Sequence, residues 1–425
     1  LNYNLLMQKI IINGGRPLKG SIHISGSKNA SLPIMAACIL TNDQLELSNI
    51  PNLDDVKTMS KVLSSLGVEV NEDNISKNKI ILHYKNSDHS VAEYDLVRKM
   101  RASVLVLGPL LARKREATVS LPGGCAIGAR PIDIHIEALQ KLGAEFSLEQ
   151  GYIKCKAPKG LIGCELDLPK ISVGASENII MAACLAKGQT KITNIAIEPE
   201  VIDLINCLKL MGSKIEIENE RTALIQGVEE MKGVSYSIIP DRIEALTYII
   251  AGALSAEHLL IKDINANDIH NVLDILKKLN IDVEINNNEI SVAKSSIDQG
   301  IELDTEEFPG FPTDLQAQMM VLMSLGKKKS IIRENIFENR FMHVPELNRM
   351  GGNIEISGKK AIIHPCDGFL GAQVMATDLR ASVSLVLAGL VANGETTLNR
   401  IYHLDRGYEN IETKLQSIGA DIKRI

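Results

Sequence analysis

One cysteine in a glycine-rich segment has the surroundings best suited to chemistry in this sequence of 425 residues. Cys125 lies in the run PGGCAIGARP, which begins at Pro122 and contains three glycines, with prolines at both ends. Such a composition favours a hinged loop. A thiol on that loop, five residues from Arg130, can act as a nucleophile or as a general acid.

Other chemistry-bearing residues open six apolar segments along the chain. They are Lys28 and Asn29, Arg101, Ser176 and Glu177, Asp241 and Arg242, Asp314, and Asp378 with Arg380. If these segments are helices with converging N-termini, their free N–H groups and positive dipole ends form an anion site. The alternative is that these residues are N-caps and solvated first turns. Arginine at a helix start opposes the dipole, which favours ligand contact for Arg101 and Arg380.

An internal repeat indicates the elements that carry these residues. A tag of the form Leu-x-x-Leu-Gly, followed by alternating apolar and polar residues, recurs six times at intervals of roughly 70 residues. The turn residues are Gly67, Gly143, Gly212, Asn280, Gly351 and Gly419. Glycine and asparagine are the residues that a left-handed helix C-cap selects. Each tag therefore predicts a helix that ends in a left-handed residue and is followed by a strand.

The remaining parts of each repeat complete a βαβαββ unit. The apolar segments are apolar on nearly all sides, so we expect buried helices. After each turn residue, alternating residues around a polar turn predict a hairpin, as in KIEIENERTALIQG, which begins at Lys214. Six such units predict an α/β protein of two lobes, with three units around the buried helices of each lobe.

The segment around Cys125 is an insertion in this repeat. Twelve residues separate Ser120 from Asp133, whereas five separate Ser48 from Asp54 at the equivalent connection. A long loop in an otherwise tight repeat is more often functional than structural. For Cys38, Cys184 and Cys207 we expect instead the role of small buried apolar side chains.

Composition excludes several classes of function. The net charge is −6 and aromatic residues make up 3%, which disfavours nucleic-acid binding. No apolar stretch reaches the length of a membrane span, and no secretory signal is evident, so we expect a cytoplasmic protein. The seven cysteines form no CxxC pair, and the sequence holds no Walker loop or HExxH motif, so we expect neither disulfides nor a metal site.

Eight motifs, in order along the chain, resemble a known family of enolpyruvyl transferases. They are SGSKNA, MRAS, LPGGCAIGARP, SVGA, FPTDLQAQ, ENRFMHVPEL, ATDLRAS and HLDRGYE. The sequence resembles the UDP-N-acetylglucosamine 1-carboxyvinyltransferases, which open peptidoglycan synthesis in the cytoplasm. It also resembles the sister family of 5-enolpyruvylshikimate-3-phosphate synthases, which lack the cysteine loop.

The resemblance implies where the lobes begin and end. One lobe would span residues 28–238 and carry the lid loop at about 120–131. The other would combine residues 1–27 with 239–425, because the chain crosses twice. The active site would lie in the cleft of this two-lobed fold.

The implied reaction moves the enolpyruvyl group of phosphoenolpyruvate to the 3-hydroxyl of UDP-N-acetylglucosamine, with loss of phosphate. The resemblance implies four catalytic residues: Cys125, Asp314, Lys28 and Arg406. Cys125 would protonate C3 of phosphoenolpyruvate, and Asp314 would take the hydroxyl proton. Lys28, Arg130, Arg380 and Arg406 would hold the phosphate and carboxylate groups. No cofactor is implied, because phosphate loss drives the transfer, and the epoxide fosfomycin would alkylate Cys125.

The resemblance also implies the residues that bind the nucleotide sugar. They are Asn29, Arg101, Arg130, Pro131, Ile132, Asp133, Ile134, Lys170, Ile171, Ser172, Val173, Gly174, Asp314, Ile336 and Arg340, with Asp378 nearby. Three of these residues have plainer alternatives. Asp314 could be only an N-cap, Asp378 only a loop brace, and Arg340 only part of a surface ion pair.

Two other functions stay open from the sequence. The first is the shikimate-pathway transferase, which would not need Cys125. The second is a catalytically silent relative that binds the UDP-sugar, although the retention of Cys125, Asp314, Lys28, Arg130 and Arg406 argues against it. Phosphate release with each sugar would separate the three.

Overall fold

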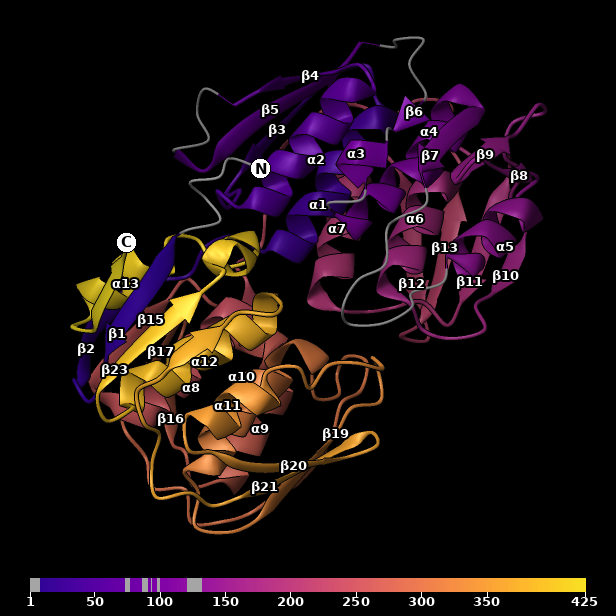
Figure 1. Cartoon of the computed structure of the whole chain (residues 1–425). Coiled ribbons are helices and arrows are strands. Elements are labelled where there is room, and N and C mark those ends of the chain that lie inside the picture. Colours follow the sequence, from indigo (N-terminus) through magenta and orange to yellow (C-terminus); the bar gives the residue numbers. More distant parts are fainter. Residues whose placement is uncertain (1–7, 73–76, 86–90, 93, 98–99, 121–131) are drawn as a thin grey trace. The chain divides into compact units, whose positions relative to one another are not determined.

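The structure is a computed structural model that describes residues 8–425, apart from 73–76, 86–90, 93, 98–99 and 121–131 (Figure 1). The side chains of Leu96, Val97 and Arg101 are also outside the description. The described chain forms two compact units, each with its own apolar core. The middle unit spans Gly26 to Ile239, and the terminal unit combines the chain up to Ser25 with Pro240–Ile425.

Each unit contains three four-stranded sheets with the same topology. In every sheet the first two strands are parallel and the remaining neighbours are antiparallel. The middle unit holds β14 (Ser235–Ser237), β3 (Gln44–Ser48), β5 (Lys79–Tyr84) and β4 (Val68–Asn71); β6 (Val91–Ala92), β7 (Glu116–Ser120), β9 (Tyr152–Lys156) and β8 (Glu145–Glu149); and β10 (Glu165–Asp167), β11 (Gln189–Thr193), β13 (Thr222–Gln226) and β12 (Lys214–Glu218). The terminal unit holds β2 (Leu18–His23), β15 (Ala256–Lys262), β17 (Glu289–Val292) and β16 (Val283–Asn286); β18 (Glu302–Asp304), β19 (Ser330–Arg333), β21 (Lys360–His364) and β20 (Asn353–Ser357); and β22 (Gln373–Met375), β23 (Glu395–Asn399), β1 (Lys9–Asn13) and β24 (Asp421–Arg424).

The apolar segments form the central helices of the units, as their composition predicts. These are α1 (Lys28–Ala37), α4 (Leu107–Lys114) and α6 (Val173–Ala183) in the middle unit, and α8 (Arg242–Ser255), α10 (Gln316–Ser324) and α12 (Leu379–Val391) in the terminal unit. Within each unit these helices pack against one another, and Figure 1 shows α8, α10 and α12 close together. Every residue of α10 is buried. The predicted βαβαββ repeats around buried helices are therefore confirmed.

The second helices of the repeats each end two residues before the predicted turn residue. They are α2 (Asp54–Ser65), α5 (Asp133–Lys141), α7 (Pro199–Leu210), α9 (His270–Lys278), α11 (Val344–Arg349) and α13 (Ile411–Ser417); a short helix, α3, covers Tyr94–Val97. All six turn residues have positive φ, from 62° at Asn280 to 102° at Gly212. The left-handed caps predicted from the repeat are confirmed.

Five 3-10 helices complete the described elements. They are η1 (Cys38–Leu40), η3 (Arg101–Val106), η4 (Ala266–Asp268), η5 (Thr313–Leu315) and η6 (Ile401–Arg406). The helix expected after Arg101 begins as the 3-10 helix η3 and continues as α4. Pro109 has no N–H to donate to the carbonyl of Leu105, so regular α-helical hydrogen bonding starts only around it.

The two chain crossings exchange first strands between repeats. β2 pairs with β15 of the terminal unit, but the chain then continues into α1 of the middle unit. β14 pairs with β3 of the middle unit and continues into α8 of the terminal unit. The last sheet also contains both ends of the described chain, because β1 pairs with β23 and β24. None of the described helices is long and apolar enough to span a membrane.

Candidate functional site

Asp314 is the centre of a charged cluster in the terminal unit. It lies in η5, whose N-cap is Pro312, so the N-cap alternative for Asp314 was wrong. Its Oδ1 accepts a hydrogen bond from Arg340 Nη2 at 2.6 Å, and its Oδ2 accepts one from Arg380 Nη2 at 2.8 Å. Both oxygens of this carboxylate are therefore held by guanidinium groups.

Arg340 is nearly buried and belongs to this cluster. Its side chain is 6% exposed, so the alternative of a surface ion pair was wrong. Besides Asp314, Arg340 Nη1 donates to Thr313 Oγ1 at 2.9 Å, and the guanidinium lies 5.0 Å from the centre of the Phe337 ring. The hydrogen bonds to Thr313 and Asp314, together with the contact with the Phe337 ring, fix the orientation of the Arg340 guanidinium.

Arg380 enters the cluster from the first turn of α12. Its Nη1 donates to the hydroxyl of Tyr408 at 3.2 Å. Burial alone would lower the pKa of the Arg380 guanidinium, but Asp314, Tyr408 and Asp241 raise it above its ordinary value. The cation therefore stays charged although it is buried, because an opposite charge lies beside it.

Two further predicted residues border this cluster. The Asp378 side chain accepts hydrogen bonds from the backbone N–H groups of Arg380 and Ala381, so it is the N-cap of α12. Arg406 ends η6 and is partly buried. Burial and the positive charge of Arg406 lower the pKa of His403, while Asp378 acts in the opposite direction. Asp378 and Arg406 therefore both act electrostatically on His403.

Ile336 lies in the segment that links β19 to Arg340. Its backbone N–H donates to Glu334 Oε1 at 3.0 Å, and its side chain is partly buried. The terminal unit thus brings together Asp314, Arg340 and Arg380 directly, with Asp378, Arg406 and Ile336 around them. The three arginines can bind anionic groups, and the carboxylate of Asp314 can accept a proton.

Lys28 is the main cation placed by the middle unit. It is the first residue of α1, next to Asn29, and the Ser27 side chain caps this helix. Its Nζ lies 3.6 Å from Asp55 Oδ2, and the Lys28 side chain is 11% exposed. A lysine at this position adds positive charge to the N-terminal end of a buried helix.

The two predicted nucleotide-sugar segments of the middle unit lie at the starts of α5 and α6. Ile132 precedes α5, Asp133 is exposed and Ile134 is buried. Lys170 is exposed, Ser172 caps α6, and the segment from Ile171 to Gly174 is partly buried. Asn178 of α6 donates to the backbone carbonyl of Val104 at 2.9 Å and bonds His135 Nδ1 at 3.0 Å, which links α5 and α6 to η3.

Four predicted residues fall wholly or partly outside the description. Cys125, Arg130 and Pro131 lie in the segment 121–131, outside the described residues. Arg101 begins η3, and its side chain is likewise outside the description. The described part of the chain contains no group of three or more residues that could hold a metal ion.

Sequence reasoning missed the residues that support the cluster. Tyr408 is buried, and its hydroxyl bonds Thr247 at 2.9 Å, Gln318 at 3.3 Å and Arg380. Glu334 is buried beside Thr313 and Ile336. The motifs HLDRGYE and ENRFMHVPEL border or contain these residues. Only their position in or near these motifs signalled them, because the sequence does not show that either side chain is buried.

Comparison with known proteins identifies the family. A family model described as EPSP synthase (3-phosphoshikimate 1-carboxyvinyltransferase) matches residues 12–415. The UDP-N-acetylglucosamine 1-carboxyvinyltransferase of Pelagibacter ubique is 54% identical over 419 residues, which cover 99% of this chain and 100% of that protein. The one of Gluconobacter oxydans is 51% identical over 420 residues, with coverage of 99% and 100%. This chain belongs to the UDP-N-acetylglucosamine 1-carboxyvinyltransferase family. The predicted membership is confirmed, and the sister family is not favoured.

Two solved structures of other enolpyruvyl transferases share the fold of this chain. The enolpyruvyl transferase NikO from Streptomyces tendae has a TM-score of 0.89 at 24% identity, covering 98% of this chain and 99% of that one. EPSP synthase from Acinetobacter baumannii has a TM-score of 0.77 at 17% identity, with coverage of 99% and 100%. At these identities the likeness concerns the fold alone, and it confirms the predicted two-lobed enolpyruvyl transferase fold.

Proposed function

We propose that this chain transfers the enolpyruvyl group of phosphoenolpyruvate to the 3-hydroxyl of UDP-N-acetylglucosamine and releases phosphate. The observation that carries the proposal is the 54% identity, over the full length, to an enzyme named for this reaction. The substrates are small molecules, and the step belongs to peptidoglycan synthesis in the cytoplasm. The cluster around Asp314 supports the proposal, because it combines a carboxylate with arginines that suit anionic substrates.

The chemistry is addition followed by elimination. Cys125 donates a proton to C3 of phosphoenolpyruvate, and C2 becomes cation-like. The 3-hydroxyl oxygen then bonds to C2 while Asp314 takes its proton. The Cys125 thiolate then takes a proton back from C3, the C–O bond to phosphate breaks, and the double bond returns. The proton held by Asp314 passes to the departing phosphate, so both side chains regain their starting protonation.

Lys28, Arg130, Arg380 and Arg406 hold the anionic groups of phosphoenolpyruvate. The side chain of Asp314 is 26% exposed, so its carboxylate can accept the hydroxyl proton, and Arg380, at 3% exposed, binds that carboxylate from the buried side. Charge-assisted hydrogen bonds in a dry site stabilise the developing charges of the transition state.

The nucleotide sugar is held mainly by the middle unit. Asn29 and Arg101 serve together with the residues from Arg130 to Ile134 and from Lys170 to Gly174. Ile336 and Arg340 contribute from the terminal unit, with Asp378 as a brace at the start of α12. Ser172 and Asp378 both cap helices, so the segments around them are fixed before any ligand binds.

Phosphate release tests the proposal directly. The chain is incubated with phosphoenolpyruvate and either UDP-N-acetylglucosamine or shikimate 3-phosphate. We expect phosphate only with the UDP-sugar, and a product heavier by the enolpyruvyl group in mass spectrometry. Phosphate only with shikimate 3-phosphate would favour the sister activity. Binding of the UDP-sugar without any phosphate would favour a silent relative and would contradict the proposal.

A further inference from the structure

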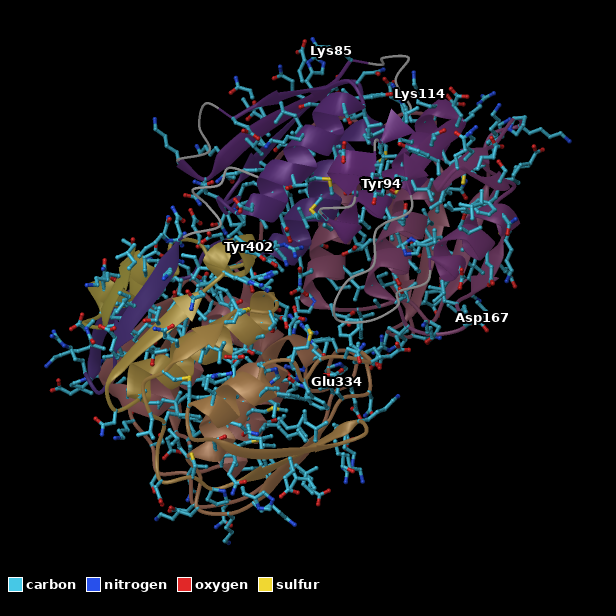
Figure 2. All side chains as sticks on the ribbon, in the orientation of Figure 1. Lys85, Tyr94, Lys114, Asp167, Glu334 and Tyr402 are labelled. Carbon is cyan, nitrogen blue, oxygen red and sulfur yellow. The ribbon has the colours of Figure 1, made fainter. Side chains whose placement is uncertain are left out.

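Glu334 is a buried carboxylate that joins several parts of the terminal unit (Figure 2). It directly follows β19 and is 1% exposed. Its Oε1 accepts hydrogen bonds from Thr305 Oγ1 and from the backbone N–H groups of Ile336 and Phe337, each at 3.0 Å. Its Oε2 accepts one from Thr313 Oγ1 at 2.8 Å. A buried carboxylate is costly unless its oxygens are bonded in this way.

The donor and the acceptor of each hydrogen bond at Thr313 Oγ1 are fixed by the partners. Arginine has no acceptor, so Arg340 Nη1 must donate to Thr313 Oγ1, at 2.9 Å. The single hydroxyl hydrogen of Thr313 is then directed to Glu334 Oε2. Because Arg340 also binds Asp314, the path from Glu334 to Asp314 is a chain of three hydrogen bonds. The Glu334 carboxylate thereby sets the orientation in which Thr313 receives the guanidinium.

The same carboxylate shapes the backbone that follows it. Its bonds to the N–H groups two and three residues later fold the segment Glu334–Phe337 into a tight turn. Asn335 N–H donates to Thr305 Oγ1 at 2.9 Å, and Thr305 in turn donates to Glu334. The Glu334 side chain therefore holds the turn directly through two backbone N–H groups and indirectly through Thr305.

We propose that Glu334 is a positioning residue for the nucleotide-sugar substrate, acting through Thr313 on the Arg340–Asp314 pair and directly on the backbone at Ile336. The inference rests on the proposed function, and it adds a residue that touches no substrate. Its consequence is that a change of one atom in Glu334 weakens binding of the UDP-sugar more than binding of phosphoenolpyruvate.

Glu334→Gln is the test variant, because it replaces one oxygen by an NH₂ group at almost constant volume. The amide oxygen keeps the three donors at the Oε1 position, so the NH₂ group faces Thr313. Thr313 then meets two donors, Arg340 and the amide, and its own hydrogen loses its acceptor. We expect the KM for UDP-N-acetylglucosamine to rise about tenfold or more, and the KM for phosphoenolpyruvate to change less than about twofold.

Substitutions of Thr313 examine the same path and serve if Glu334→Gln does not fold. Thr313→Ser keeps the hydroxyl and is expected to retain near wild-type kinetics. Thr313→Val has nearly the same shape but lacks the hydroxyl, so we expect it to raise the KM for UDP-N-acetylglucosamine as Glu334→Gln does. In the double variant Glu334→Gln with Thr313→Val, the two effects should not add, since both substitutions interrupt the same chain of hydrogen bonds.

Glu302→Gln is the matched control. Glu302 is an exposed carboxylate in the same sheet that pairs with Arg333 at the surface.

The outcomes separate this inference from the proposed function. A role confined to stability would lower kcat with both KM values unchanged, and that result would overturn the inference. Equal kinetics of Thr313→Val and Thr313→Ser, or additive effects in the double variant, would overturn it as well. A wild-type chain that releases no phosphate from phosphoenolpyruvate and UDP-N-acetylglucosamine would overturn the proposed function itself.

Discussion

Asp314 and Arg380 form an ion pair in which the carboxylate is partly exposed and the guanidinium is buried. Asp314 keeps 26% of its side-chain surface, whereas Arg380 keeps 3%, and Oδ2 lies 2.8 Å from Nη2. Arg380 is further anchored by the Tyr408 hydroxyl. Arg380 therefore fixes the position of the Asp314 carboxylate, which can accept a proton.

The first prediction concerns proton transfer by Asp314. Asp314→Asn keeps an oxygen that can accept from one guanidinium, so the chain should still fold. It removes the proton acceptor, so turnover should fall about 10²- to 10⁴-fold. Phosphate release measures the turnover, and thermal unfolding measures the fold. The exposed pair of Asp298 with Lys327 gives the control Asp298→Asn, which should keep full activity. Turnover of Asp314→Asn within about twofold of wild type would contradict the role of general base.

The second prediction concerns the thiol of Cys125. Fosfomycin should add covalently to Cys125, and intact-protein mass spectrometry in the presence of the UDP-sugar should show one adduct. Burial raises the pKa of the thiols of Cys38, Cys184 and Cys207, which keeps them protonated and unreactive.

Variants identify the modified cysteine. Cys125→Ser should lose the adduct and most turnover while it still binds the UDP-sugar, and Cys125→Asp should also lose the adduct. Cys366→Ser is the control, because Cys366 is partly buried and its thiol pKa is raised by burial. An adduct that persists in Cys125→Ser would refute the assignment, as would unchanged turnover in that variant.

The third prediction concerns stability at acid pH. Burial lowers the pKa of His135 from 6.5 to about 4, so the folded chain holds this imidazole neutral. An unfolded histidine gains its proton below about pH 6.5, so the stabilising contribution is complete above that pH and is lost as the pH falls toward 4. At pH 5 the loss should be about 2 kcal/mol.

Urea unfolding at pH 7 and pH 5 measures this effect by comparison of wild type with His135→Gln. Burial, with Glu200 and Glu198, raises the pKa of Glu177, which acts in the opposite sense on the wild-type curve. The difference between the two proteins removes that contribution, because both contain Glu177. We expect the free energy of unfolding of wild type to fall more than that of His135→Gln. Parallel changes in both proteins would show that His135 does not titrate on unfolding.

The fourth prediction concerns the left-handed turn that follows α7. Gly212 has φ of 102°, and a Cβ there would meet no heavy atom within 4 Å. Gly212→Ala should therefore cost about 1–2 kcal/mol from backbone strain alone. Asn280 occupies the equivalent turn at φ 62°, so Asn280→Gly should be neutral or slightly stabilising. Chemical denaturation measures both, and equal stabilities of Gly212→Ala and wild type would count against strain at this turn.

Local patterns were enough to predict the repeat. A left-handed turn needs a residue without a steric penalty, and this requirement concerns only neighbouring backbone atoms. The six glycine and asparagine positions could therefore be read directly, and so could the buried helices, whose apolar residues have one favourable environment. The motifs FPTDLQAQ and ATDLRAS, which contain Asp314 and Arg380, were each recognisable because the residues of one motif stay together along the chain.

The bonds that hold the site depend on tertiary structure. Asp314, Arg340 and Arg380 come from three separate segments, and no local spacing predicts that both oxygens of Asp314 meet guanidinium groups. Glu334 looked like an ordinary polar residue after a strand, and only the fold places Thr305 and Thr313 against it. The sequence alone determined where the second helix of each repeat ends and which helices are buried, because those features follow from short-range sterics and burial. The tertiary structure decided which polar groups share a hydrogen bond, because such partners are chosen by distance in space and not by distance along the chain.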